Sequence, residues 1–308
     1  MAAATLRWSE HTFTATVRYD TKITMPELPE VETVRRSLQQ ALAQRRILDV
    51  TRIAWPRTIA EPSPELFREL LHDRAILDVD RRAKYVIIRL DRDEALVVHL
   101  RMTGQLTIAD STAEPDQHTH VALRLDSGQQ LFFRDTRKFG RIWLLDRDGL
   151  AVLYGKLGPE PLDDALTAEA FRTLLRRRKG RLKPLLLDQA LIAGLGNIYV
   201  DESLWLAQIH PLQTVGQLSD EQIDRLYAAI REVLSQSIAR RGTSLSDYLD
   251  AWGTKGDNQN FLQVYDRKAQ PCLRCGTPIE RLLVAQRGTH VCPTCQRLDG
   301  ATEQYVGE

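Results

Sequence analysis

Residues 25–29 read Met-Pro-Glu-Leu-Pro and place a proline directly after a methionine. If that methionine were the initiator and were removed, Pro26 would carry a free secondary amine, with a pKa near ~8 against ~10.4 for lysine. Such an amine is a neutral nucleophile at physiological pH and suits Schiff-base chemistry. Glu27 follows at once and supplies a carboxyl group that can move protons. On this stretch alone, the favoured alternative is that Pro26 and Pro29 only punctuate a loop before a helix.

The four cysteines give the strongest local signal in the chain. Cys272-x2-Cys275 is followed by Cys292-x2-Cys295, with the stretch 276–291 between the two pairs. This spacing fits one tetrahedral Zn²⁺ ion, and four thiolates leave no open position, so the zinc is expected to be structural. A disulfide scaffold would not leave the whole stretch 1–271 without a cysteine. Between the pairs, 279–284 and 289–292 are expected to form a hairpin with Arg287 at its tip, where it can meet a phosphate.

Three further stretches carry weaker signals. Residues 194–199, Gly-Leu-Gly-Asn-Ile-Tyr, could turn backbone N–H groups toward a phosphate, with Asn197 adding a donor. Taken alone, the stretch favours a plain turn between two helices. The basic run at 172–183 could contact nucleic acid or could be a solvated face. The polar loop 253–261 could be a mobile cap over a site or an ordinary linker.

Composition describes an ordinary globular protein. The chain has 308 residues, 43% of them hydrophobic and 27% charged, with a net charge of +1. No apolar run approaches the ~20 residues of a membrane span. Since residues 1–24 hold three basic and two acidic side chains, the remainder is neutral, and a nucleic-acid binder must gather its positive charge on one face.

The stretch 1–24 does not resemble a signal peptide, because it lacks an apolar core and its charges are scattered. We expect an over-long start, with Met25 as the true initiator. The alternative is an extension that the cell really makes.

The pattern of apolar residues predicts a leading helix at 30–43, then a β-rich region, then helices. The expected strands lie at 76–80, 84–90, 95–100, 104–108, 120–125, 130–134 and 141–145. Short strands with polar turns favour an antiparallel β-sandwich. After a linker turn at 157–162, helical patterns fall at 167–178, 183–192, 198–207, 219–239 and 244–250.

These elements predict an α+β chain with several parts. The expected boundaries are an extension at 1–24, a β-sandwich domain at 25–150, a helical domain at 151–262, a zinc finger at 263–297 and a tail at 298–308.

Taken together, the motifs resemble the formamidopyrimidine-DNA glycosylases of the Fpg/Nei family of base-excision repair enzymes. The resemblance covers about 25–297. The motifs that carry it are 26–33 (Pro-Glu-Leu-Pro-Glu-Val-Glu-Thr), Lys84-Tyr85, 99–104 (His-Leu-Arg-Met-Thr-Gly), 135–140 (Asp-Thr-Arg-Lys-Phe-Gly), 194–199 and the four cysteines. It implies an α+β fold: an N-terminal antiparallel β-sandwich with a leading helix, a helix–two-turn–helix DNA-binding domain and a C-terminal four-cysteine zinc finger.

The resemblance also implies a reaction on damaged double-stranded DNA. A damaged purine is flipped out, Pro26 attacks C1′ of its sugar to form a Schiff base, and Glu27 supplies protons. Elimination then cuts the strand on both sides, assisted by Lys84 and then by Arg287. The residues implied to fill the gap left by the flipped nucleotide are Met102, Arg137 and Phe139, and further implied DNA contacts are His118, Arg178 and Asn197. A monomer in the bacterial cytoplasm, associated with the chromosome, is the family expectation.

One departure from the family pattern bears on the chemistry. With residues 1–24 attached, the Pro26 nitrogen is an amide and not a nucleophile, so we expect the working protein to begin at Pro26. If the extension is retained, the alternative is a non-catalytic protein that binds lesions or abasic DNA. A third reading keeps the enzyme but changes the lesion to oxidised pyrimidines. An unrelated zinc-ribbon protein would leave everything before the finger unexplained.

Overall fold

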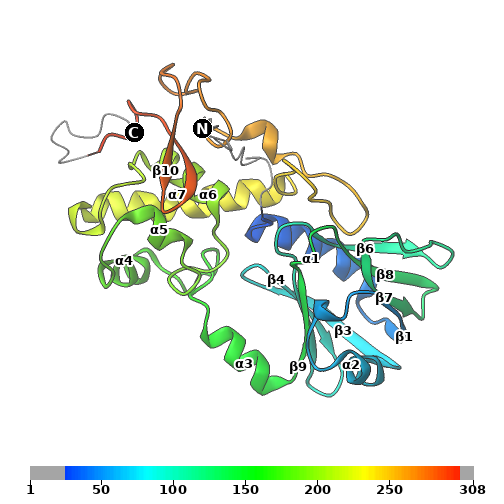
Figure 1. Cartoon of the computed structure of the whole chain (residues 1–308). Helices are drawn as coiled ribbons and strands as arrows, with labels where there is room; N and C mark the ends of the chain where they lie inside the picture. The colour runs from blue at the N-terminus through cyan, green and yellow to red at the C-terminus, as the bar shows by residue number, and fades with distance from the viewer. Residues whose placement is uncertain (1–24, 299–308) are drawn as a thin grey trace, which may run out of the picture.

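A computed structural model describes residues 25–298 of the chain. The expected extension 1–24 lies outside the described residues, and so does the expected tail apart from its first residue. Figure 1 shows the strands of the N-terminal part on one side and helices α4–α7 with the C-terminal hairpin on the other, with α3 between them. In the part of the chain that the structure describes, no helix is long and apolar enough to cross a membrane.

The leading helix is confirmed as α1 (Leu28–Leu42), which begins two residues before the predicted start. A capping box at its N-terminus joins Glu27 and Glu30, and Pro29 occupies the first turn, where its missing N–H costs nothing. The apolar stripe of α1 is completely buried and includes Val31 and Leu38. This stripe packs on the sheet and fixes the helix that follows Pro26.

The predicted antiparallel sandwich is confirmed. Its strands are β1 (Arg46–Ile53), β2 (Ile59–Glu61), β3 (Arg74–Arg82), β4 (Tyr85–Leu90), β5 (Ala95–His99), β6 (Gly104–Asp110), β7 (Thr119–Leu125), β8 (Gln129–Asp135) and β9 (Arg141–Leu145). They run in the order β2-β9-β5-β4-β3-β1-β7-β8-β6, and only two residue pairs join β3 to β1. Because Ile88 and Val98 share one core with Leu123 and Phe133, the two halves of the sheet face each other. The pair β2–β9 is parallel.

Two helices beside the sandwich were not predicted. Helix α2 (Pro64–Leu71) begins at the N-cap Ser63 and buries Phe67 and Leu71 completely. Helix α3 (Arg147–Gly155) begins at the N-cap Asp146 and leads into an irregular segment. They were missed because they are only 8 and 9 residues long and lie in or beside a region whose other sequence patterns predict strands.

The helical part contains α4 (Ala168–Arg176), α5 (Leu182–Leu187), α6 (Asn197–Ala207) and α7 (Asp220–Ala239). The 3-10 turn η1 (Pro56–Thr58) belongs to the sandwich, η2 (Val215–Gln217) lies between α6 and α7, and η3 (Asn258–Phe261) follows α7. The helix predicted at 183–192 is too long, because the backbone becomes extended at Asp188. The helix predicted at 244–250 is wrong. That segment is irregular, and its hydrogen bonds go to β6: the Gln105 amide donates to the Asp247 carbonyl, and Ile108 N–H donates to the Ala251 carbonyl at 2.8 Å.

The finger hairpin is confirmed as β10 (Glu280–Val284) and β11 (Arg287–Val291). Ala285 and Gln286 both have positive φ, 47° and 61°, which matches the two-residue turn that joins tightly twisted strands. The tip is therefore formed by these two residues, and Arg287 is the first residue of β11.

Helix α6 fastens the finger to the rest of the molecule. The Glu202 carboxylate accepts hydrogen bonds from the N–H groups of Gln263, Val264 and Tyr265 at 2.9 Å each. One residue earlier, Asp201 forms a fully buried ion pair with Lys183 at 2.6 Å and accepts the N–H of His290 in β11 at 2.8 Å. Two adjacent carboxylates of one helix therefore hold the finger: Asp201 binds β11 and Glu202 binds the segment that leads into the finger.

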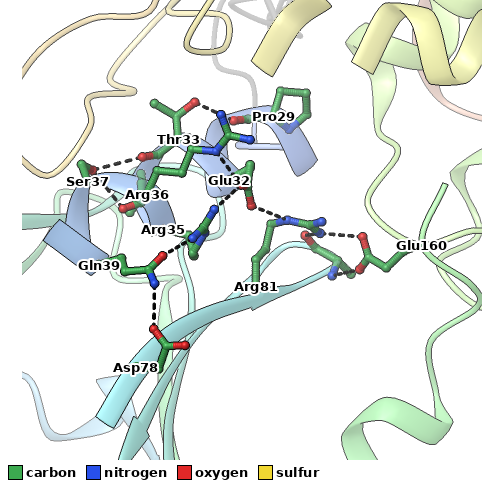
Figure 2. Close-up of polar contacts among 12 residues, drawn as sticks. Pro29, Glu32, Thr33, Arg35, Arg36, Ser37, Gln39, Asp78, Arg81 and Glu160 are labelled. Atoms are coloured by element: carbon green, nitrogen blue, oxygen red, sulfur yellow. Dashed lines mark hydrogen bonds and ion pairs between the residues drawn. The ribbon is translucent and has the colours of Figure 1, made fainter. Parts of the chain in front are cut away.

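A second polar network joins α1 to the segment that follows α3. Figure 2 shows Glu32 of α1 beside Arg81 of β3, and Arg81 in turn beside Glu160. The Arg81–Glu32 and Arg81–Glu160 contacts measure 3.2 and 2.7 Å. Glu160 also pairs with Arg82 at 2.8 Å and accepts the Ala83 N–H at 2.6 Å. Glu160 thus holds the turn between β3 and β4 against the entry to the helical part.

Candidate active site and nucleic-acid interface

Glu27 lies at the N-terminus of α6, which comes from the helical part of the chain. Its carboxylate accepts the N–H of Ile198 at 2.9 Å and that of Tyr199 at 3.3 Å. Gly196 makes this approach possible, because a Cβ atom there would lie 2.4 Å from Glu27 Cδ. Burial raises the pKa of Glu27, although Lys84 and the backbone N–H groups oppose the shift. A buried carboxyl with a raised pKa is suited to proton transfer.

The Gly-rich turn before α6 therefore has a different role from the predicted one. The sequence favoured a plain turn between two helices and left a phosphate contact as the second possibility, whereas the N–H groups of Ile198 and Tyr199 bind the Glu27 carboxylate. The turn also anchors the start of α1, since Leu28 N–H donates to the Gly194 carbonyl at 3.0 Å. Leu28 itself belongs to the core of the helical part. The turn therefore binds and positions residues 27–28.

Lys84 lies in the turn between β3 and β4 and is buried. Burial lowers its pKa, the Glu27 and Glu30 carboxyls oppose that shift, and Arg287 adds to it. The ammonium group makes no hydrogen bond or ion pair with any other residue in the described range 25–298. A lysine with a lowered pKa can accept a proton near neutral pH.

Two adjoining hollows bring the predicted catalytic residues together. A hollow of about 310 Å³ is lined by Glu27, Lys84, Asn197 and Arg287, among others. A hollow of about 550 Å³ is lined by Met25, Arg101, Met102, Phe139, Arg141 and Arg287. Met25 lines both hollows, and the nitrogen of the buried Pro26 is bonded to it. Removal of Met25 would free this nitrogen where the two hollows meet.

The residues expected to fill the DNA gap lie together beside the larger hollow. Phe139 has 47% of its surface exposed, and the Arg137 guanidinium lies 5.1 Å from the centre of its ring. Their loop is held by the buried Asp135, which accepts the N–H of Arg137 at 3.1 Å and that of Gly140 at 2.7 Å. An exposed ring and cation on a rigid loop can replace base stacking.

The other predicted DNA contacts are placed differently. Asn197 lines the smaller hollow, but its amide donates to the Gly288 carbonyl at 2.9 Å and so braces the finger. His118 is half-buried, and its carbonyl accepts the Asp135 N–H at 2.9 Å, next to the gap-filling loop. Arg178 is exposed just beyond α4. Neither His118 nor Arg178 lines either hollow.

Four site residues were not singled out from the sequence: Glu30, Tyr85, His99 and Arg101. Tyr85 and His99 line the smaller hollow and pack edge-to-face with ring centres 4.7 Å apart. Burial, with the cations of Arg101 and Lys84, lowers the pKa of His99 to about 3, so the ring is neutral. Tyr85 and His99 stand in motifs that are visible in the sequence. Because they alternate with apolar neighbours, the pattern predicts only that they belong to strands.

Glu30 is a second buried carboxyl beside Glu27. It accepts the Glu27 N–H at 2.9 Å and the Thr243 N–H at 2.7 Å, and the Tyr199 hydroxyl donates to it. Burial and the neighbouring Glu27 charge raise the pKa of Glu30 to about 7. Its place in the first turn of α1 is favourable for the helix dipole, and the residue also links α1 to α6 and to the segment after α7.

The four cysteines form one site, as predicted. Their sulfur atoms all lie within 4.8 Å of one another, with 4.0 Å between Cys272 and Cys295 and 3.4 Å between Cys275 and Cys292. Tetrahedral Zn–S bonds place sulfur atoms ~3.8 Å apart, so the set fits one Zn²⁺ ion. Trp205 Nε1 donates to Cys272 Sγ at 3.4 Å and joins this site to α6. The zinc is structural.

A β-sandwich, a helical part and a four-cysteine finger that meet at a proline–glutamate pair define the class of DNA-repair glycosylases with this architecture. Family models of the formamidopyrimidine-DNA glycosylase N-terminal domain, of its H2TH domain and of the zinc finger found in FPG and IleRS match residues 25–142, 157–248 and 269–298. The chain belongs to the formamidopyrimidine-DNA glycosylase family.

Individual proteins agree with this family. The formamidopyrimidine-DNA glycosylase of Herpetosiphon aurantiacus is 53% identical over 272 residues, which cover 88% of this chain and 100% of that protein. The Lactococcus lactis FPG, solved as a mutant with a Fapy-dG containing DNA, is 40% identical with a TM-score of 0.83, covering 88% and 100% of the two chains. The same protein with an abasic site containing DNA gives a TM-score of 0.81, with coverage of 88% and 99%.

Proposed function

We propose that this protein is a bifunctional DNA glycosylase and AP lyase. It excises oxidised purines, such as 8-oxoguanine and formamidopyrimidines, from duplex DNA. The observation that carries the proposal is the convergence of Glu27, Lys84 and Arg287, from three distant parts of the chain, on one hollow next to Pro26. The relatives support the substrate class, since the Lactococcus lactis protein is solved with Fapy-dG and with abasic DNA.

The geometry supports a sequence of proton and electron-pair movements. The free Pro26 amine attacks C1′ of the everted nucleotide, and the bond from C1′ to the base breaks. Glu27, whose pKa is raised by burial, gives a proton to the ring oxygen as the sugar opens to the Schiff base. In this proposal Lys84 and Arg287, which line one hollow, assist the two eliminations in which the flanking phosphates leave, and Lys84 removes a proton from the sugar. The zinc takes no part in these steps and holds the finger that carries Arg287.

The working protein begins at Pro26 in this proposal. The Pro26 nitrogen is nucleophilic only when it is not in a peptide bond with Met25. Two comparisons support this start: the N-terminal family model matches from residue 25, and the Herpetosiphon aurantiacus relative is matched over 100% of its own length by 272 residues of this chain. If residues 1–24 are retained, the same surfaces support a non-catalytic protein that binds lesions or abasic DNA.

The proposal also includes the domain boundaries, the DNA contacts, the oligomeric state and the location of the protein. The domain boundaries are 25–150, 151–262 and 263–297, with His118, Arg178 and Asn197 contacting DNA around the site. The protein acts as a monomer in the bacterial cytoplasm, on the chromosome. The gap left by the everted nucleotide is filled by Met102, Arg137 and Phe139.

Borohydride trapping tests this function. Protein made from the natural gene with its own upstream sequence is mixed with an 8-oxoguanine:cytosine duplex and reduced, and the cross-linked peptide is mapped. The expected result is one covalent adduct on an N-terminal Pro26, absent when Glu27→Gln protein is used or an undamaged duplex is supplied. Bound DNA without an adduct, on protein that retains residues 1–24, would instead support the binding protein. Stronger trapping on a thymine-glycol duplex would move the substrate to oxidised pyrimidines.

A further inference from the structure

Arg101 occupies the junction of the two hollows. Three residues line both of them: Met25, Arg101 and Arg287. Once Met25 is removed, as the proposed function requires, the two arginines are the side chains that both hollows share. One comes from the sandwich and the other from the finger. Both cations therefore lie beside the reacting groups of the smaller hollow and beside the gap-filling residues of the larger one.

The charge of Arg101 has no partner within the described protein. Many arginines elsewhere are paired, as Arg74 is with Asp91 and Glu94 at 2.5 Å each. In contrast, the guanidinium groups of Arg101 and Arg287 form no ion pair or side-chain hydrogen bond with any residue of the range 25–298. Lys84 and Arg141 add two more cations to the same hollows. Such a cluster repels itself, and an anion bound among its members relieves that repulsion.

The backbone holds Arg101 in this place. Its φ is 56°, in the left-handed region that residues with a side chain rarely adopt. The Arg101 N–H donates to Nδ1 of the buried His99 at 3.0 Å, and Gly104 N–H donates to the Leu100 carbonyl at 3.0 Å. A Cβ on Gly104 would lie 2.4 Å from that carbonyl oxygen, so the turn closes tightly. Leu100 is buried while Arg101 is exposed.

We propose that Arg101 binds a phosphodiester of the damaged strand next to the everted nucleotide, so that Arg101 and Arg287 grip two successive phosphates. A guanidinium suits this ligand because it offers two parallel N–H donors to two phosphate oxygens. The inference rests on the proposed function, because it identifies the strand by the reacting groups in the adjoining hollow. It gives His99 a role as a positioning residue for the turn that carries Arg101.

The first test measures binding without cleavage. The probe is a duplex that contains tetrahydrofuran, a stable abasic analogue, and the dissociation constant is measured at several salt concentrations. Arg101→Gln is expected to weaken binding about tenfold, the size of a lost charge-assisted hydrogen bond, and to reduce the slope of log affinity against log salt by about 1. Arg101→Lys keeps the charge and therefore the slope. Arg124→Gln, an exposed arginine of β7 that lines neither hollow, is the matched control and is expected to match the wild type.

The second test locates the phosphate. Each phosphate that flanks the analogue is replaced in turn by an uncharged methylphosphonate. The wild type is expected to lose affinity at the contacted position, and Arg101→Gln is expected to lose nothing further there while still responding at the other positions. Equal affinity and slope for Arg101→Gln and the wild type would overturn the inference, and so would an equal response of both proteins at every position.

These outcomes are separable from failure of the proposed function or of folding. If the wild type binds the analogue no better than an undamaged duplex, the proposed function itself fails. If it discriminates but Arg101→Gln is unchanged, only the role of Arg101 fails. Zinc content and the thermal unfolding midpoint of Arg101→Gln show whether it folds. If it does not, the Arg101→Lys response in the methylphosphonate series decides the question.

Discussion

At the scale of single residues, burial shifts the pKa values of the acid–base groups of the site in the direction that favours their uncharged forms. Glu27 and Glu30 lie one turn apart, and burial raises the pKa of both. Lys84 faces the same hollow, and burial lowers its pKa. A carboxyl and an amine whose pKa values are shifted toward each other can exchange protons with a substrate at little cost. The chemistry therefore depends on keeping water from these groups.

The first prediction concerns the pH dependence of stability. Glu30 has a pKa of about 7 when folded against 4.5 as its ordinary value, so the folded state binds its proton more tightly. Stability from this group is therefore greatest below pH 4.5 and is lost as pH rises toward 7. Relative to Glu30→Gln, the wild type is expected to lose up to ~3 kcal/mol between pH 5 and pH 8, measured by urea unfolding at fixed zinc concentration.

Glu32 provides the control of opposite sign. Although its burial opposes the shift, hydrogen bonds from Arg35 and Arg36 lower the pKa of Glu32. The advantage of wild type over Glu32→Gln should therefore be present at pH 7 and be lost on acidification below pH 4.5. If the stability of the wild type relative to each of the two variants changed with pH in the same direction, the opposite pKa shifts of Glu30 and Glu32 would be contradicted.

At the scale of elements, the N-terminus of α6 is the support on which Glu27 rests. Gly196→Ala places a Cβ 2.4 Å from the Glu27 carboxyl carbon, so the carboxyl must move. A shift of about 1 Å in a reacting group can reduce a rate ~10²-fold, and we expect a loss of that size in single-turnover cleavage. Gly216→Ala in η2 is the matched control, because no atom lies within 4 Å of the added Cβ. Equal rates for the two variants would show that cleavage does not depend on this placement of the Glu27 carboxyl at the N-terminus of α6.

The finger depends on zinc to hold Arg287. Two antiparallel strands are too few to be stable without the four-cysteine site. Chelation is expected to abolish binding of damaged DNA and to leave the β signal of the sandwich in circular dichroism. One equivalent of Zn²⁺ should restore both the finger and the activity. Full activity in protein shown to be free of metal would contradict a structural zinc.

Helices and strands could be predicted from the sequence where the hydrophobic periodicity is clear and the element is long enough to show it. The stripe of α1 and the hairpin β4–β5 have clear patterns, and both are present. Helix α2 was missed because its eight residues give too short a pattern within strand-like surroundings. The segment 244–250 has helical spacing, but the Thr243 N–H bonds to Glu30 and the Ala251 carbonyl bonds to β6, so distant partners replace the local ones. Tertiary contacts of this kind cannot be read from a window of sequence.

At the scale of the whole molecule, the site exists only where the parts of the chain meet. Glu27 is separated by 171 residues from the Ile198 N–H that it accepts, and Asn197 by 91 residues from the Gly288 carbonyl. Spacing alone predicted the cysteine site, because that signal is local, whereas the nucleophile role of Pro26 became the favoured interpretation only through the family resemblance. The convergence of Lys84 and Arg287 followed only from the family resemblance. That Arg101 has no ion-pair partner among residues 25–298 could be established only from the positions of the neighbouring carboxylates.

The last prediction concerns how the β-sandwich and the helical part are held in position relative to each other. Glu160 accepts the Ala83 N–H and pairs with Arg81 and Arg82, so its carboxylate fixes the turn that carries Lys84. Glu160→Gln keeps the shape but leaves two partly buried arginines without their shared anion. The turn then moves relative to Glu27, and single-turnover cleavage is expected to fall at least ~10-fold, with a smaller change in affinity for the abasic analogue.

The control for this variant is Glu169→Gln, an exposed acid in the first turn of α4 without an ion pair among the described residues. It should cleave like the wild type. If Glu160→Gln loses affinity and rate in equal measure, the carboxylate acts on DNA binding as a whole and not on the turn. If only the rate falls, and Arg81→Gln shows the same selective loss, the network in Figure 2 sets the distance between the lysine and the nucleophile across the two halves of the molecule.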